Sequence, residues 1–163
     1  MSPNKPSHDS PSLLARLKVE NAAWQALLQL LQDEEQALIE GAADRLAGLN
    51  TAKLNQLQTV SDHARSRLAD LQAAGHTPDH AGMDAWLAQL GQPEARTRWQ
   101  QLRDMEQDVQ AMNQRIGALI ELRLASTRQA LNVLVQSASS QGGLYDQAGQ
   151  SVAAHKGKPL TAA

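Results

Sequence analysis

The fold is decided by the stretch PEARTRWQQLRDMEQDVQAMNQRIGALIELRLASTRQALNVLVQS, residues 93–137. Proline suits the first position of a helix, and the glutamate after it lies where the helix dipole favours a negative charge. Interrupted only by Arg123 and Thr127, apolar residues recur at steps of three or four, as is typical of one apolar helix face: Leu102, Met105, Val109, Met112, Ile116, Leu119, Leu131 and Leu134. The stretch predicts a single helix roughly 65 Å long, which needs other helices or a partner to cover this face.

The composition favours helices in the rest of the chain as well. The sequence has 24 leucines, three isoleucines, no phenylalanine and only 2% aromatic residues. Because sheets prefer β-branched and aromatic residues, this composition predicts an all-α protein. The core is then aliphatic, with Trp24, Trp86 and Trp99 as isolated anchors. We predict an antiparallel, coiled-coil-like bundle of three long helices, with one short helix between the second and the third.

Helix signals divide the chain into segments. Ser10 and Pro11 can begin a first helix, Gly41 ends it, and Asp44 can cap a second helix that extends to about residue 74. A glycine- and proline-containing loop, residues 75–82, precedes a short helix over residues 83–91. The predicted organisation is a disordered lead-in (residues 1–10), a helical domain (residues 11–140) and a flexible C-terminal tail (residues 141–163).

Charged residues on the first two helices are expected to face water. Arg67, like Lys53 and Arg65, is predicted to be solvated, with its stem along apolar surface. Glu34 and Glu35 point in different directions on a helix and are predicted to belong to a hydrated face. Ile39 continues the apolar stripe of the first helix, and we therefore expect it in the core.

Helix lengths predict an uncovered apolar strip. The first two helices span roughly 45 Å each, and the third is longer by about 20 Å. In antiparallel packing, the end of the third helix then lacks cover for its apolar residues, namely Leu119, Ile120, Leu124, Leu131, Leu134 and Val135. Such a strip is typical of a binding surface. The alternatives are that this end caps the bundle or pairs with a second copy.

The sequence argues against catalysis. His76 and His80 are four residues apart, but Pro78 between them places them in a loop, so they are expected to be solvated residues and not metal ligands. His63 lies mid-helix, without the lysine-glycine pair that follows a phosphorylated histidine in phosphotransfer domains. There is no glycine-rich phosphate loop and no nucleophile signature. We predict a protein that is not an enzyme and has no cofactor.

Charge and hydropathy limit the kinds of partner and the cellular location that the protein can have. The formal net charge is −2, with bases and acids mixed along the chain, which argues against nucleic acid as a partner. No run of 18 apolar residues could span a membrane, and the first twelve residues do not form a signal peptide. The absence of cysteine fits a reducing compartment. The expected location is the cytoplasm.

Three motifs, in this order along the chain, resemble the FlgN family of flagellar type III export chaperones. Residues 13–38 loosely match the pattern LLxxExxxLxxLLxxExxAL, with Glu20 and Glu35 at its acidic positions. MNQRIGALI, residues 112–120, is similar to the family's NxxNGxLI, with Ile116 in place of the second asparagine. LYDQAGQ, residues 144–150, is close to LYGxxGQ, with Asp146 in place of a glycine.

This resemblance implies a cytosolic chaperone without ATPase activity. Its partners would be the hook-filament junction proteins FlgK and FlgL, bound through their C-terminal helical segments, and the flagellar export gate. In the family the C-terminal helical region binds the client, which coincides with the strip above. The candidate client-binding residues are Leu119, Ile120, Arg123, Leu124, Leu131, Leu134 and Val135. Tyr145 is the candidate for docking on the export apparatus, and its alternative role is a ring packed against the third helix. The alternative function is a structural or adaptor coiled-coil homodimer.

Overall fold

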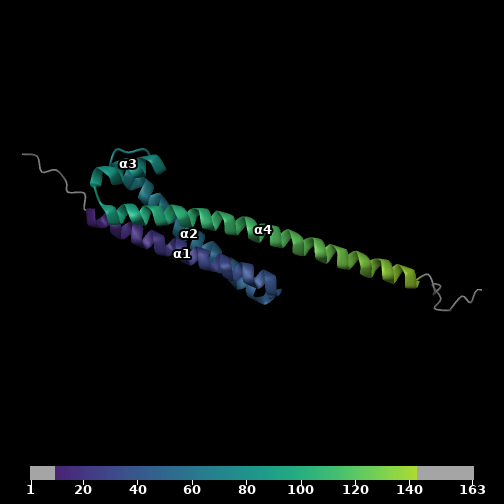
Figure 1. Ribbon diagram of the computed structural model, residues 1–163. Helices are drawn as coiled ribbons and strands as arrows, with labels where there is room; N and C mark the ends of the chain where they lie inside the picture. Colours follow the sequence, from purple (N-terminus) through teal and green to yellow (C-terminus); the bar gives the residue numbers. More distant parts are fainter. Residues whose placement is uncertain (1–9, 143–163) are drawn as a thin grey trace, which may run out of the picture. The chain divides into compact units, whose positions relative to one another are not determined.

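The structure, a computed structural model, describes residues 10–142, with side chains described for residues 13–140, and these residues form four α-helices (Figure 1). The helices are α1 (Ser10–Glu40), α2 (Ala43–Ala73), α3 (His80–Leu90) and α4 (Pro93–Gly142). The all-α prediction, with one short helix before the last long one, is confirmed. The chain divides into two compact units, residues 1–120 and residues 121–163, and α4 runs through the boundary.

The connection between α1 and α2 is a tight reversal built on Gly41. Gly41 has φ 72°, its N–H donates to the Leu38 carbonyl at 3.3 Å, and the Ala42 N–H donates to the Ala37 carbonyl at 2.9 Å. This pair of bonds is a Schellman motif, which satisfies the last carbonyls of α1. The prediction of Asp44 as the cap of α2 is wrong, because α2 begins at Ala43 and Asp44 lies in its first turn.

The loop before α3 is organised by Asp79. An Asp79 carboxylate oxygen accepts the Gly82 N–H at 2.7 Å and the Thr77 hydroxyl at 2.8 Å. Because this cap satisfies the first free N–H groups, α3 begins at His80, three residues before the predicted start. A Cβ atom at position 82 would collide with the Thr77 carbonyl oxygen, so the close approach of loop and helix requires glycine.

Within the first unit, interhelical contacts define the direction of each helix. Lys18 pairs with Glu94 at 2.8 Å, and Glu35, further along α1, pairs with Arg115 at 3.1 Å. Residue numbers rise together in both helices, so α1 and this part of α4 run in the same direction. The short connection makes α2 antiparallel to α1, and therefore to α4, which confirms the antiparallel bundle.

Two hydrophobic clusters form the core of the first unit. The cluster at the α3 end includes Trp99, which is 2% exposed and is the largest fully buried side chain. Its other buried members are Leu13, Leu17, Leu71, Met83, Leu87, Ala95 and Leu102. The second cluster is aliphatic and contains Ala23, Leu27, Leu31, Leu38, Val60, Val109, Met112 and Ile116.

Some predictions about the first two helices are wrong. Arg67 is buried, not solvated, because Glu20 on the facing helix accepts its Nε–H at 3.0 Å and the guanidinium lies 4.8 Å from the centre of the Trp99 ring. Glu34 is likewise buried, against the Lys53 ammonium at 2.7 Å. Ile39 is exposed, because Leu38 beside it takes the core position.

Parts of the predicted organisation lie outside the described residues. These are nearly all of the lead-in (residues 1–9) and most of the tail (residues 143–163), including Tyr145 and the LYDQAGQ motif. Among the described helices, none is both long and apolar enough to cross a membrane.

Candidate functional site

An apolar strip occupies one side of α4 in the second unit. Leu124, Thr127, Leu131, Leu134 and Ala138 follow one another at steps of three and four, which places them on one side of the helix. We call this strip the distal face. Every described side chain from residue 121 to residue 140 is exposed, so the leucines of the distal face meet water. Contiguous exposed apolar surface of this kind is typical of a site that binds another protein.

The predicted client-binding residues fall into two groups. Leu119 and Ile120 belong to the first unit, where Leu119 is partly buried against the aliphatic core cluster and Ile120 is exposed. The other predicted residues are exposed in the second unit, and they are Arg123, Leu124, Leu131, Leu134 and Val135. Leu119 is therefore the residue whose side chain is least accessible to a partner.

Two exposed apolar residues were not predicted. Leu122 and Val133 are 68% and 59% exposed, comparable with Leu134 at 64%. They are eleven residues apart, close to three helical turns, and lie on the side of α4 opposite the distal face. Neither residue continues the stripe at steps of three and four, so the sequence pattern does not mark them. Only their exposure in the structure identifies them.

Charged residues of both signs border the distal face. Between residues 121 and 142 the only acid is Glu121, whereas Arg123 and Arg128 are both basic and exposed. By helical position, Arg123 lies along one border of the distal face, and Glu121 and Arg128, seven residues apart, lie along the other. The Arg123 carbonyl also accepts the Thr127 hydroxyl at 2.9 Å, so this threonine offers mainly its methyl group to a partner.

The histidines lie in the first unit and have structural neighbours. His80, predicted as a loop residue, begins α3, stands edge-on to the Trp99 ring at 5.3 Å and lies 3.5 Å from a Glu106 carboxylate oxygen. Burial raises the pKa of Glu106, and the nearby His80 opposes this shift. The His76 ring lies 3.1 Å from the side-chain oxygen of Gln89. Among the described residues there is no group of three or more potential metal ligands.

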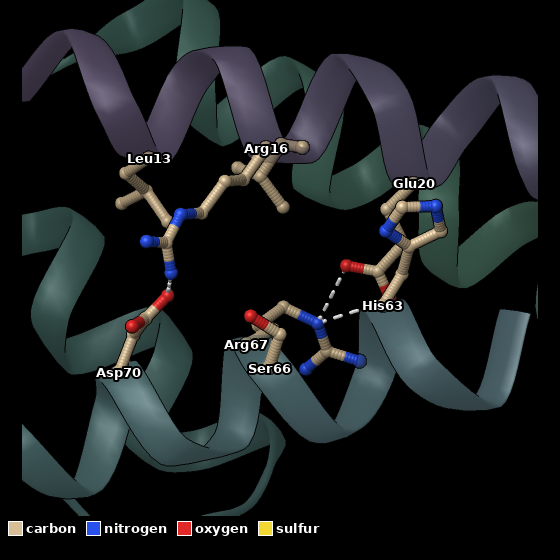
Figure 2. A pocket seen from close by; sticks show the side chains of 8 residues that line it. Leu13, Arg16, Glu20, His63, Ser66, Arg67 and Asp70 are labelled. Carbon is tan, nitrogen blue, oxygen red and sulfur yellow. Dashed lines mark hydrogen bonds and ion pairs between the residues drawn. The ribbon is translucent and has the colours of Figure 1, made fainter. Parts of the chain in front are cut away.

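A small cavity between α1 and α2 is shown in Figure 2. The ion pair of Arg16 with Asp70 lies beside it, together with that of Glu20 with Arg67. Its volume of about 30 Å³ suits a single water molecule. Since the charged groups around it already have partners, this cavity belongs to the packing of the bundle and is not a ligand site.

The fold and the distal face define an all-α protein with an exposed apolar strip on its last helix. The chain matches the family described as FlgN protein over residues 9–153. It therefore belongs to the FlgN family, the flagellar export chaperones for the hook-associated proteins FlgK and FlgL. The family is not enzymatic, which confirms the prediction from sequence. Comparison with curated proteins and with solved structures found no match.

Proposed function

We propose that the distal face of α4 is the surface on which this chaperone holds FlgK and FlgL. The client would lay a C-terminal helical segment along Leu124, Leu131 and Leu134, and Val135 would extend the contact at its border. The single observation that carries this proposal is that an apolar helical stripe is exposed along its whole length in residues 121–140. Ile120 would contribute at the start of the strip, and Leu119 would support it from the core.

The energetics suit a chaperone that must release its client. Burial of apolar surface contributes about 25 cal/mol per Å². A client segment that is disordered before binding loses conformational freedom when it becomes helical, which offsets much of this gain. The result is a complex that keeps the client from polymerising and can still dissociate at the export apparatus.

The proposal is tested by capture of FlgK or FlgL with two matched double variants. Leu131→Asp with Leu134→Asp places charges on the distal face, whereas Leu122→Asp with Val133→Asp places them on the opposite side of the same helix. Both pairs are exposed, so helical circular dichroism should be almost unchanged in each. We expect the first variant to lose the client and the second to retain it. Normal capture by the first variant would place the site elsewhere.

The C-terminal tail, residues 141–163, is proposed to act after client binding, when the chaperone reaches the export apparatus. We infer from the family resemblance that Tyr145 docks on the flagellar export gate and that the chaperone works in the cytoplasm. Deletion of residues 141–163 should leave folding and client capture unchanged and reduce export of FlgK and FlgL. Tyr145→Ala should reproduce the export defect. Loss of the fold on deletion would instead show that the tail is part of the bundle.

The second candidate function, a structural homodimer, is favoured by the same exposed strip. It predicts a dimer whose mass does not depend on concentration and persists when client is added. Light scattering of the protein alone and with FlgK separates the two, because a chaperone monomer should give a complex containing one copy of each chain.

A further inference from the structure

The apolar residues of α4 follow two different heptad registers. Within each register, residues follow one another at alternating steps of three and four. The first, which we call the bundle register, consists of Leu102, Met105, Val109, Met112, Ile116 and Leu119. The second, which we call the distal register, consists of Ile120, Leu124, Thr127, Leu131, Leu134 and Ala138. Because Ile120 directly follows Leu119, the second register is one residue out of phase with the first.

The bundle register does not continue as an apolar stripe into the second unit. Its next positions are mostly polar or small, and they are Arg123, Ser126, Ala130, Val133 and Ser137. Paired helices stay in contact only along a continuous apolar stripe, so a helix packed on the bundle register has no such stripe to follow beyond Leu119.

Burial changes where the register changes. Met112 and Ile116 are 5% and 4% exposed, in a cluster with residues of α1 and α2, and Leu119 is partly buried against the same cluster. Ile120 and Leu124, the first two members of the distal register, are 40% and 51% exposed. The bundle register is thus covered by the chain itself, and the distal register starts where this cover ends.

We propose that the distal register is a complete docking site for one amphipathic helix of FlgK or FlgL, to which α1, α2 and α3 contribute no contact. This inference rests on the proposed function and adds the boundary of the site and the kind of helix that it fits. Residues 120–138 span roughly 27 Å, which corresponds to a client helix of about 18 residues with its own heptad repeat. Because Glu121 and Arg128 give one border both signs of charge, a client has to match apolar spacing rather than charge.

The test inserts one alanine at either of two places in the full-length protein. Between Leu119 and Ile120, the insertion turns the whole distal register by about 100° relative to the first unit and preserves its internal spacing. Between Thr127 and Arg128, the same insertion divides the register into two halves that no longer share one side of the helix. Alanine is the best helix former, so helical circular dichroism should be almost unchanged in both variants.

The affinity of each variant for FlgK is then measured by calorimetric titration. We expect the insertion after Leu119 to leave the affinity unchanged. The insertion after Thr127 should weaken binding by at least about tenfold, because a client helix can then bury only one half of the apolar stripe at a time.

A compensated variant separates spacing from composition. Insertion of alanine after Thr127 together with removal of Ala130, an exposed residue, returns Leu131, Leu134 and Ala138 to their original distances from Leu124. Its composition equals that of the wild type, and we expect wild-type affinity for FlgK. Weakened binding by the insertion after Leu119, normal binding by the insertion after Thr127, or no recovery in the compensated variant would overturn the proposal. A stable dimer formed through the distal register in place of the FlgK complex would overturn it as well.

Failure of this inference can be separated from failure of the proposed function. If Leu131→Asp with Leu134→Asp abolishes capture of FlgK and the insertion after Leu119 abolishes it too, the client-binding surface stands and its independence from the first unit is wrong. If that double variant captures FlgK normally, the proposed surface itself is wrong.

Discussion

Arg67 and Glu20 form a buried ion pair between α2 and α1, with Arg67 Nε 3.0 Å from Glu20 Oε2. Their side chains are 7% and 2% exposed, and the guanidinium also lies over the Trp99 ring of α4. Through these two contacts, the Arg67 side chain connects all three long helices of the first unit.

Loss of either member of this ion pair should lower the stability of the protein. Arg67→Met leaves the Glu20 carboxylate buried without its cation, and we expect the free energy of unfolding to fall by about 3–5 kcal/mol in urea titrations. Glu20→Met with Arg67→Met should recover much of this loss, because apolar side chains of similar volume can replace a buried pair. The control is Arg65→Met on the exposed side of α2, with an expected change within about 0.5 kcal/mol. An equal effect of the two single variants would contradict the assigned role.

Two glycines should respond oppositely to alanine. Gly82→Ala requires the Thr77 carbonyl to move, and we expect a loss of about 1–3 kcal/mol, as for other overpacked sites. Gly117 lies within α4 with open space at its Cβ position, so Gly117→Ala should stabilise the protein by up to about 1 kcal/mol. Thermal unfolding of both variants provides the comparison. A stabilised Gly82→Ala variant would show that the loop is free to move away from α3.

Client binding should protect the amides of the distal part of α4. In the free protein, residues 121–140 have no buried side chains, and helices without tertiary packing are only marginally stable. We therefore expect their amides to exchange with solvent faster than those around Trp99, and to slow by about tenfold or more when FlgK is bound. Protection that appears only in the first unit would contradict binding at the distal face.

The raised pKa of Glu106 predicts how the stability of the folded protein changes with pH. Burial is the main cause, Glu20 adds to it, and His80, Arg67 and Arg103 oppose it. A carboxyl whose pKa is higher in the folded state favours folding while protonated, so its stabilising contribution is complete below the unfolded pKa and is lost as pH rises through the folded pKa.

Glu106→Gln should therefore raise the melting temperature relative to wild type at pH 7, and by less at pH 4. Asp108→Asn, an exposed change of equal charge on the same helix, should show no such trend. A wild-type protein that gains stability over Glu106→Gln as pH rises would show that attraction to His80 and the arginines outweighs burial.

Local features were predictable from the sequence because their causes are local. Pro93 marks the start of α4, and Gly41 and Gly91 the ends of α1 and α3, through restricted or permissive backbone dihedrals. The predicted start of α3 is three residues too late, because the true start depends on a cap from the side chain of Asp79, a residue of the predicted loop.

The candidate site was predictable in part. The spacing of Leu124, Leu131 and Leu134 identified an apolar stripe. The sequence could not distinguish Leu119, which packs on the core, from Ile120 beside it, which is exposed. Their surroundings depend on residues of α1 and α2 that are distant in the chain.

The all-α class, the ends of most helices and, through three ordered motifs, the family follow from the sequence alone. Apolar periodicity, proline and glycine act within a few residues, so no tertiary information is needed to interpret them. Tertiary packing alone determines which charges are buried, because Arg67 has to meet Glu20 from another helix before its desolvation is compensated. It also decided that the apolar stripe of α4 is buried at Val109, Met112 and Ile116 but exposed beyond residue 120, since exposure depends on what packs against a helix and not on its own pattern.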